Sequence, residues 1–224
     1  MKNIDYYIDS LERKVYEKIS DDINEDSLDK IVNKYLGFHF SDYRSSAFQR
    51  FYFNSINNET FYFGTSTFFS QFKYQYALQG IDNSFLLKLE ENKSKILKLI
   101  RKDDLTTLYF EYFFKTKLKH GNKFIEKDLG SFFAKLVHTF CPQRYCALDN
   151  PVKNYFGLAK ESFFISFHIV SRAYYSWGKN NREIFNQINT KFSQIDKGSL
   201  IEQGKLTDLK LLDLIYWTKA NIKE

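Results

Sequence analysis

The 224-residue sequence predicts a compact all-α domain of about ten helices. Apolar residues recur at three- and four-residue steps along most of the chain, the spacing that places them on one face of a helix. Only two prolines and nine glycines interrupt regular structure, which favours long helices over many short strands. With 43% apolar residues, the chain is long enough to bury a sizeable core.

The expected elements follow one another in order. Between Ile4 and Ile19 the apolar residues share one stripe, and a second helix runs from an N-cap at Ser27 to a stop at Gly37. Asp42 caps a third helix, and alternating aromatic residues in FYFGTSTFF predict one short strand over 61–69. Further helices are expected over residues 65–80, 84–104 (one helix or a broken pair), 104–121, 126–140, 151 onward, 161–178, 181–195 and 207–220.

Charge divides the chain into two parts. Residues 1–41 hold nine acidic and six basic side chains, a net charge of −3, and the whole chain is +6, so the remainder carries +9. We therefore expect an acidic N-terminal helical pair over 1–41 and a basic helical body over 42–224. A basic body suits a polyanion such as nucleic acid, and a merely solvated lysine-rich surface is the alternative.

Several classes of protein are disfavoured by composition. No apolar run approaches the roughly 18–20 residues of a membrane span, and the first residues lack the apolar region of a secretory signal. Two cysteines without a repeated framework suit a reducing compartment, so we expect a cytoplasmic protein.

One short segment, CPQRYCALDNPVKNYFGL over residues 141–158, holds both prolines and both cysteines. Pro142 must end the preceding helix, and Pro151 suits the first turn of the next one, with Asn150 as its N-cap. Asp149 then lies just before the cap, where the helix dipole favours an ionised carboxylate by roughly 0.3–1 kcal/mol. The alternative is an ordinary turn acid that only starts a helix.

This segment resembles the helix-hairpin-helix DNA glycosylase superfamily, which includes endonuclease III. Gly130 opens the helix SFFAKLVHTF, and Asp149 follows nineteen residues later in DNPV, so that the resemblance covers residues 124–158. It implies that Asp149 is a catalytic carboxylate, which stabilises positive charge on the deoxyribose and positions the attacking water. The hairpin signature is reduced to DLGS, and the cysteines of the family's iron–sulfur loop are lacking. Phe132 stands where bifunctional members have a lysine, so a monofunctional enzyme is implied.

Basic residues surround this segment. In a hairpin DNA binder, amides at the turn hold a phosphate and nearby lysines neutralise its neighbours. Solvated lysines that only oppose a helix dipole are the alternative. The expected nucleic-acid-binding residues are Lys117, Lys119, Lys123, Gly130, Arg144 and Lys153, with duplex DNA as the partner.

Other candidate sites are weaker. His138, Cys141 and Cys146 form H-x2-C-x4-C, which is not a common zinc-finger spacing, so we expect buried thiols and no metal. His168 lies in an aromatic-rich helix and reads as a packed histidine. Phosphate-binding glycine loops and other cofactor motifs are not found, and we expect no cofactor.

Two functions remain open from sequence. The first is a DNA-binding helical protein that resembles glycosylases and excises a flipped base if it is an enzyme. The second is a non-enzymatic nucleic-acid-binding or scaffold subunit of a bacterial genome-maintenance or phage-defence complex. Such a subunit would meet a protein partner through its acidic N-terminus or through the amphipathic helix over 207–220.

Overall fold

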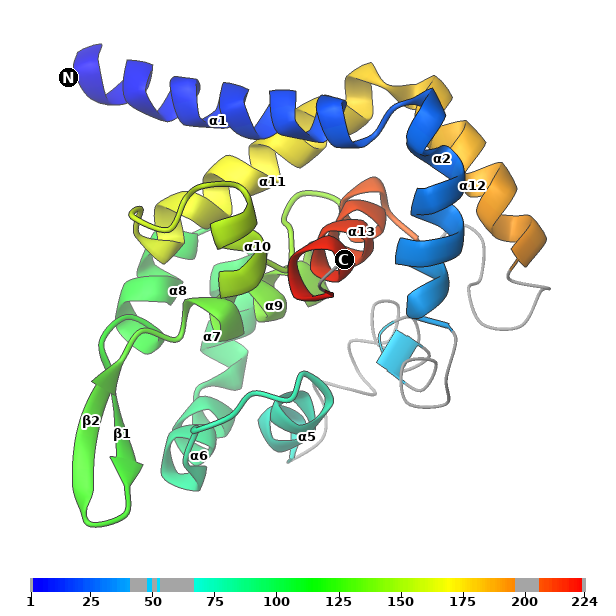
Figure 1. The fold of residues 1–224 in the computed structure, drawn as a ribbon. Helices are drawn as coiled ribbons and strands as arrows, with labels where there is room; N and C mark the ends of the chain where they lie inside the picture. Colours follow the sequence, from blue (N-terminus) through cyan, green and yellow to red (C-terminus); the bar gives the residue numbers. More distant parts are fainter. Residues whose placement is uncertain (1, 41–47, 50–51, 53–66, 196–205, 223–224) are drawn as a thin grey trace.

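The structure is a computed structural model that describes residues 2–40, 48–49, 52, 67–195 and 206–222. The prediction of a mostly helical compact domain is confirmed, and the sheet in the described part is a two-stranded hairpin (Figure 1). None of the described helices is both long and apolar enough to cross a lipid bilayer. In chain order the elements are α1 (Lys2–Asp22), η1 (Glu25–Ser27), α2 (Leu28–Lys30), the π-helix η2 (Ile31–Leu36), α5 (Phe68–Gln75), α6 (Asn83–Glu91), α7 (Lys93–Arg101), α8 (Leu105–Tyr112), β1 (Thr116–His120), β2 (Lys123–Lys127), α9 (Gly130–Phe140), α10 (Asn150–Tyr155), α11 (Phe163–Asn180), α12 (Arg182–Ile195) and α13 (Asp208–Asn221).

The C-terminal helix α13 is a central element of the fold. It packs against α10, α11 and η2, and residues on all sides of it are buried, including the charged Lys210 and Asp213 (Figure 1). A helix that is apolar or buried all round belongs to a core rather than to a surface. The expectation that this helix offers a face to a partner protein is therefore wrong, because its own chain covers that face.

The acidic N-terminal pair is packed onto the body. Helix α1 lies along α11, and its Val15 and Ile19 are fully buried, while η2 contacts α12 and α13. Lys219 on α13 forms an ion pair with Asp22 at the end of α1, with 2.8 Å between the charged atoms. The described residues up to 40 and the body thus contribute to one hydrophobic core.

The segment before Gly130 differs from the expected helix over 104–121. Helix α8 ends at Tyr112, and residues 116–127 form the antiparallel hairpin β1–β2 instead. Thr116 and Leu118 alternate with lysines in β1, and Phe124 and Ile125 are good strand formers in β2. Gly121, with φ of +59°, supplies the left-handed turn residue between the strands.

The predicted strand over 61–69 lies mostly outside the described residues, and its last two residues belong to α5. The helix expected after Asp42 also begins outside them.

Gly130 opens α9 as expected, but in a packed environment. A Cβ at this position would lie 2.2 Å from Cγ of Phe163, so only glycine allows α11 to start this close to α9. Its amide donates to the Asp128 carboxylate at 2.9 Å and is not free to hold a phosphate. Gly130 therefore allows α9 and α11 to pack closely, in place of the contact with nucleic acid that the sequence predicted.

We expect Gly130→Ala to lower the free energy of unfolding by about 1–3 kcal/mol, because the added methyl overlaps the Phe163 side chain. Urea denaturation measures the change. The control is Ser131→Ala at the neighbouring position, which should change stability by less than about 0.5 kcal/mol. Equal stability of the Gly130 variant and the wild type would contradict this packing role.

Candidate nucleobase pocket beside Asp149

Asp149 lies at the start of α10, as the sequence predicted, but the N-cap is one residue earlier than expected. Helix α9 ends at Phe140 before Pro142, and Pro151 lies in the first turn of α10. The N-cap is Asp149 itself rather than Asn150, and its carboxylate accepts from the Val152 amide at 3.0 Å. An aspartate caps as well as an asparagine does, and the extended backbone at position 149 suits it.

The Asp149 carboxylate is buried, with 8% of the residue exposed. Burial raises the pKa of Asp149, whereas the Val152 amide, the charge of Lys135 and the Trp217 side chain lower it. Lys135 comes from α9 and Trp217 from α13, so this acid lies where three helices meet. The carboxylate is thus fixed in direction and faces a cation instead of bulk water.

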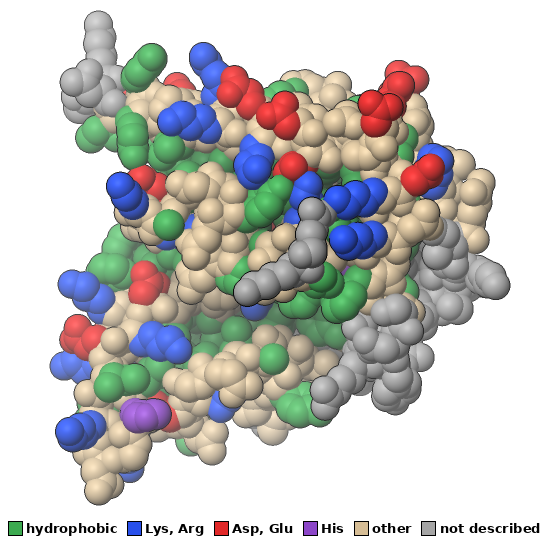
Figure 2. All heavy atoms as spheres, viewed as in Figure 1, with side chains coloured by type: hydrophobic (Ala, Val, Ile, Leu, Met, Phe, Trp, Pro, Cys, Tyr) green, Lys and Arg blue, Asp and Glu red, His purple; other side chains and the backbone are tan. Residues whose placement is uncertain are grey.

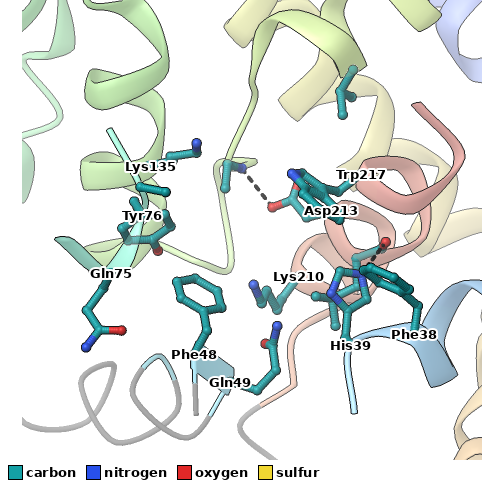
Figure 3. Close-up of a pocket in the computed structure, with 14 residues that line it drawn as sticks. Phe38, His39, Phe48, Gln49, Gln75, Tyr76, Lys135, Lys210, Asp213 and Trp217 are labelled. Carbon is teal, nitrogen blue, oxygen red and sulfur yellow. Dashed lines mark hydrogen bonds between the residues drawn. The ribbon is translucent and has the colours of Figure 1, made fainter. Parts of the chain in front are cut away.

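A second carboxylate, Asp213, joins α13 to the connection between α9 and α10. It accepts from the Ala147 amide at 2.7 Å (Figure 3). Burial raises the pKa of Asp213 well above its usual range, and burial likewise lowers the pKa of its neighbour Lys210. Asp149 raises the pKa of Asp213 as well, so the two carboxylates are electrostatically linked.

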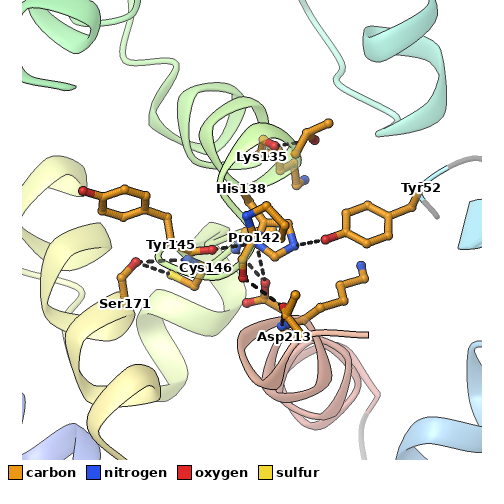
Figure 4. A network of polar contacts seen from close by, with 12 residues as sticks. Tyr52, Lys135, His138, Pro142, Tyr145, Cys146, Ser171 and Asp213 are labelled. Carbon is orange, nitrogen blue, oxygen red and sulfur yellow. Dashed lines mark hydrogen bonds and ion pairs between the residues drawn. The ribbon is translucent and has the colours of Figure 1, made fainter. Parts of the chain in front are cut away.

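His138 lies at the centre of the buried polar network behind this connection (Figure 4). Its Nδ1 donates to the Tyr145 carbonyl at 2.6 Å, and its Nε2 accepts from the Tyr52 hydroxyl at 2.7 Å. Burial lowers the pKa of His138 to about 3, so the ring is neutral at physiological pH. The Asp213 oxygen at 3.5 Å from Nδ1 is therefore not part of an ion pair with it.

The cysteines are structural in the described fold. Cys146 is fully buried, donates to the Phe167 carbonyl at 3.9 Å and accepts from the Ser171 hydroxyl at 3.2 Å, and burial raises the pKa of its thiol. Cys141 is only half-buried, so the expectation of two buried thiols holds for Cys146 alone. Among the residues that the structure describes, no group of three or more His, Cys, Asp or Glu side chains could hold a metal ion. His168 packs against Phe164 and Tyr145, with its pKa lowered by burial.

A cavity of about 310 Å³ lies in front of Asp213 (Figure 3). Its walls combine aromatic rings with a few polar groups, the usual make-up of a small-molecule site. Ala147 and Val152, on either side of Asp149 in sequence, form part of the wall. The lining residues are Phe38, His39, Phe48, Gln49, Gln75, Tyr76, Ala77, Lys135, Ala147, Val152, Lys210, Asp213, Leu214 and Trp217.

Two buried polar side chains of this pocket point to a ligand. Gln49 is only 2% exposed, and its Oε1 has no hydrogen-bond partner within the described part of the chain. Lys210 is 4% exposed, and its ammonium lies 4.0 Å from the centre of the Tyr52 ring. Burying an unpaired polar oxygen costs about 1–3 kcal/mol, so a bound molecule that donates to Gln49 would recover that cost.

The structure separates the six residues expected to bind nucleic acid. Lys117, Lys119 and Lys123 lie together on the exposed hairpin, where Figure 2 shows lysine and arginine side chains at the lower left. Lys153 instead is buried and donates to the Ala159 carbonyl at 3.1 Å, so it does not lie with the exposed hairpin lysines. Arg144 is paired with Asp103 at 2.5 Å.

Sequence reasoning missed most of the pocket. Lys210 and Asp213 lie three residues apart within the expected amphipathic helix over 207–220, a spacing that is also common on exposed helix faces, so local sequence does not reveal their burial. Lys135, one turn beyond Phe132 on α9, carried no local signal. Gln49 and Tyr76 come from other segments and meet the helices only in the fold.

We expect Asp149→Ala to lower the free energy of unfolding by about 0.5–2 kcal/mol, because the α10 cap is lost. Asp149→Asn keeps a capping oxygen and should stay within about 0.5 kcal/mol of the wild type. Urea denaturation of the wild type and of both variants measures these differences in the free energy of unfolding. Equal losses in both variants would show that the charge, not the cap, stabilises this helix start.

A further prediction concerns His39 on the pocket wall, whose Nε2 donates to the Leu214 carbonyl at 2.9 Å. Burial lowers the pKa of His39 to about 4, below its value near 6.5 in an unfolded chain. The stabilisation by neutral His39 is therefore complete above about pH 6.5 and is lost as the pH falls toward 4, by about 1.4 kcal/mol per pH unit.

The stability gap between the wild type and His39→Gln should thus narrow by about 2 kcal/mol between pH 7.5 and 5.0 in urea titrations. Comparison with the variant cancels the titration of the buried carboxylates. A gap that stays constant over this range would contradict the burial of a neutral ring.

No known family model matches the chain, and no curated protein and no solved structure shows significant similarity to it. The residues of the pocket and its surroundings are therefore the basis for assigning a function.

Proposed function

We propose that the protein binds DNA and holds one everted base in the pocket between α9 and α13, where Asp149 serves base excision. The observation that carries this proposal is the buried Gln49 oxygen, which has no hydrogen-bond partner among the described residues, in a pocket with aromatic walls. A nucleobase has ring faces that stack on aromatic side chains and an edge of donors and acceptors. Figure 3 shows Gln49 and Lys210 close together on one side of the cavity and Tyr76 and Lys135 on the other.

The size and charge of the pocket favour a base over a phosphate. A volume of about 310 Å³ is at the small end for ligand sites, which suits a single ring system. Two lysines, Lys135 and Lys210, face two carboxylates, so the positive charge that a phosphate needs is largely compensated. An uncharged planar ring that hydrogen-bonds on its edge fits this balance.

Asp149 suits the role of a carboxylate that stabilises a cationic sugar. It lies between the wall residues Ala147 and Val152 in sequence and is oriented by its own helix start. Burial raises its pKa, while the Val152 amide and Lys135 favour the ionised form. Departure of a base from deoxyribose builds oxocarbenium character, which a fixed negative charge stabilises. Water is the proposed nucleophile, because Phe132 is buried in the core and supplies no amine, and the pocket amines Lys135 and Lys210 face the two carboxylates.

The test is a single-turnover assay on duplexes that carry uracil, alkylated or oxidised bases. The wild type should release one of these bases, and Asp149→Asn should be slower by on the order of 100-fold while it folds and binds normally. Asp104→Asn is the matched control, since Asp104 caps α8 in the same way, through the Thr107 amide, and is not among the pocket residues.

Excision that survives Asp149→Asn would remove Asp149 from the mechanism. Failure of the wild type to release any of the tested bases would remove the enzymatic part of the proposal. Duplex binding measured in parallel then decides whether DNA binding stands alone.

The second candidate is a non-enzymatic subunit of a protein complex. It is favoured by the exposed N-terminal end of α1, where Ile4 and Tyr6 lie among acidic side chains. Exposed apolar groups of this kind suit a protein partner. Light scattering after co-expression with neighbouring genes distinguishes the two, since a lone active monomer argues against a subunit role.

A further inference from the structure

The β1–β2 hairpin is the part of the molecule that projects furthest from the helices in Figure 1. Every residue of β2 is exposed, and Leu118 is the one buried residue of β1. Five lysines and one glutamate lie between residues 115 and 127, a net charge of +4. None of the residues that line the cavity in front of Asp213 comes from this hairpin, so its composition needs a separate explanation.

The register of the two strands decides what each face presents. Leu118 pairs with Ile125, and this face turns its buried leucine toward the helices. Because side chains alternate along a strand, the opposite face carries Lys117, Lys119, Phe124 and Glu126. Phe124 is directly opposite Lys119 and is 71% exposed. The outward face therefore presents an apolar ring beside two cations.

The hairpin is held in place by contacts at its base and along one edge. The Lys119 amide donates to the Asp82 carboxylate at 2.6 Å, and Asp82 in turn caps α6. The Leu129 amide donates to the Phe113 carbonyl at 2.9 Å and closes the hairpin onto α8. A binding element fixed in this way loses little freedom when it meets a partner.

We propose that the β1–β2 hairpin enters a groove of duplex DNA, where Lys117 and Lys119 of the outward face and Lys123 beside the turn contact phosphates and Phe124 packs against the bases. A two-stranded ribbon fits the major groove, and apolar side chains of DNA-binding proteins contact or separate bases. The lysine-rich charge is complementary to phosphate and would be repelled by most basic partners. The proposal rests on the proposed DNA binding and adds the surface that carries it.

Phe124 is tested by fluorescence anisotropy with a short labelled duplex. Phe124→Ala should weaken binding by roughly 5- to 150-fold, and Phe124→Tyr, which keeps the ring, should restore most of it. Tyr74→Ala is the matched control, because Tyr74 on α5 is 82% exposed and lies outside the hairpin.

The lysines are tested by the salt dependence of the same binding. Replacing Lys117, Lys119 and Lys123 by alanine should reduce the slope of log K against log salt by about 0.9 for each lost phosphate contact. Hairpin variants should retain base release at saturating protein, whereas Asp149→Asn should retain binding.

The outcomes separate the two proposals. If the wild type binds no duplex, the proposed function fails and the hairpin role fails with it. If the wild type binds but Phe124→Ala and the triple-lysine variant bind equally well with an unchanged salt slope, only the hairpin role is overturned. The exposed ribbon would then be a surface for a protein partner.

Discussion

The hydrogen bond from the Ala147 amide to Asp213 fixes the geometry on which the candidate site depends. It ties the central helix α13 to the connection between α9 and α10, two residues before Asp149. A second hydrogen bond, from the Thr207 hydroxyl at the start of α13 to the Pro142 carbonyl, acts in the same direction, so both ends of the connection are fixed against α13. The structure thus buries a carboxyl group at a position where a leucine would pack at a lower free-energy cost.

Burying Asp213 destabilises the fold, and packing gives no reason for a carboxyl group at this position. Lys210, Asp213, Lys135 and Asp149 form a cluster of opposite charges at the end of a cavity, and burial shifts the pKa of each. Shifted ionisable groups beside a cavity are typical of functional sites. The neutral His138 behind them supports the connection through Tyr145 and leaves the charge balance to the four side chains in front.

The sequence predicted those features that local rules decide. Pro142 and Pro151 set the end of α9 and the start of α10, and Asp149 was placed within one residue of its capping position. The hairpin was missed because its alternation is hidden in a lysine-rich stretch that also reads as a helix end. The burial of α13 and the pocket were missed because they depend on segments from residue 38 to residue 217 that meet only in the fold.

The two proposed surfaces, the β1–β2 hairpin and the pocket, would have different roles in binding DNA. Figure 2 shows mainly basic side chains on the hairpin, while over α1 and α2 acidic side chains lie mixed with basic ones, and residues 1–41 carry a net charge of −3. This asymmetry would orient the molecule as it approaches a polyanion, with the hairpin leading and the acidic helix facing away. Phosphate contacts of this kind position a protein without reading sequence, so selection of a base would rest with the pocket.

The claim that the pocket receives a base is tested most directly by photo-cross-linking. A duplex with a halogenated uracil at a mismatched position is irradiated with the protein, and the modified residue is identified by mass spectrometry. The account predicts cross-links to the aromatic pocket residues Tyr76 or Trp217, because an everted base would lie against their rings. Cross-links confined to the hairpin and the outer surface, with none in the pocket, would contradict it.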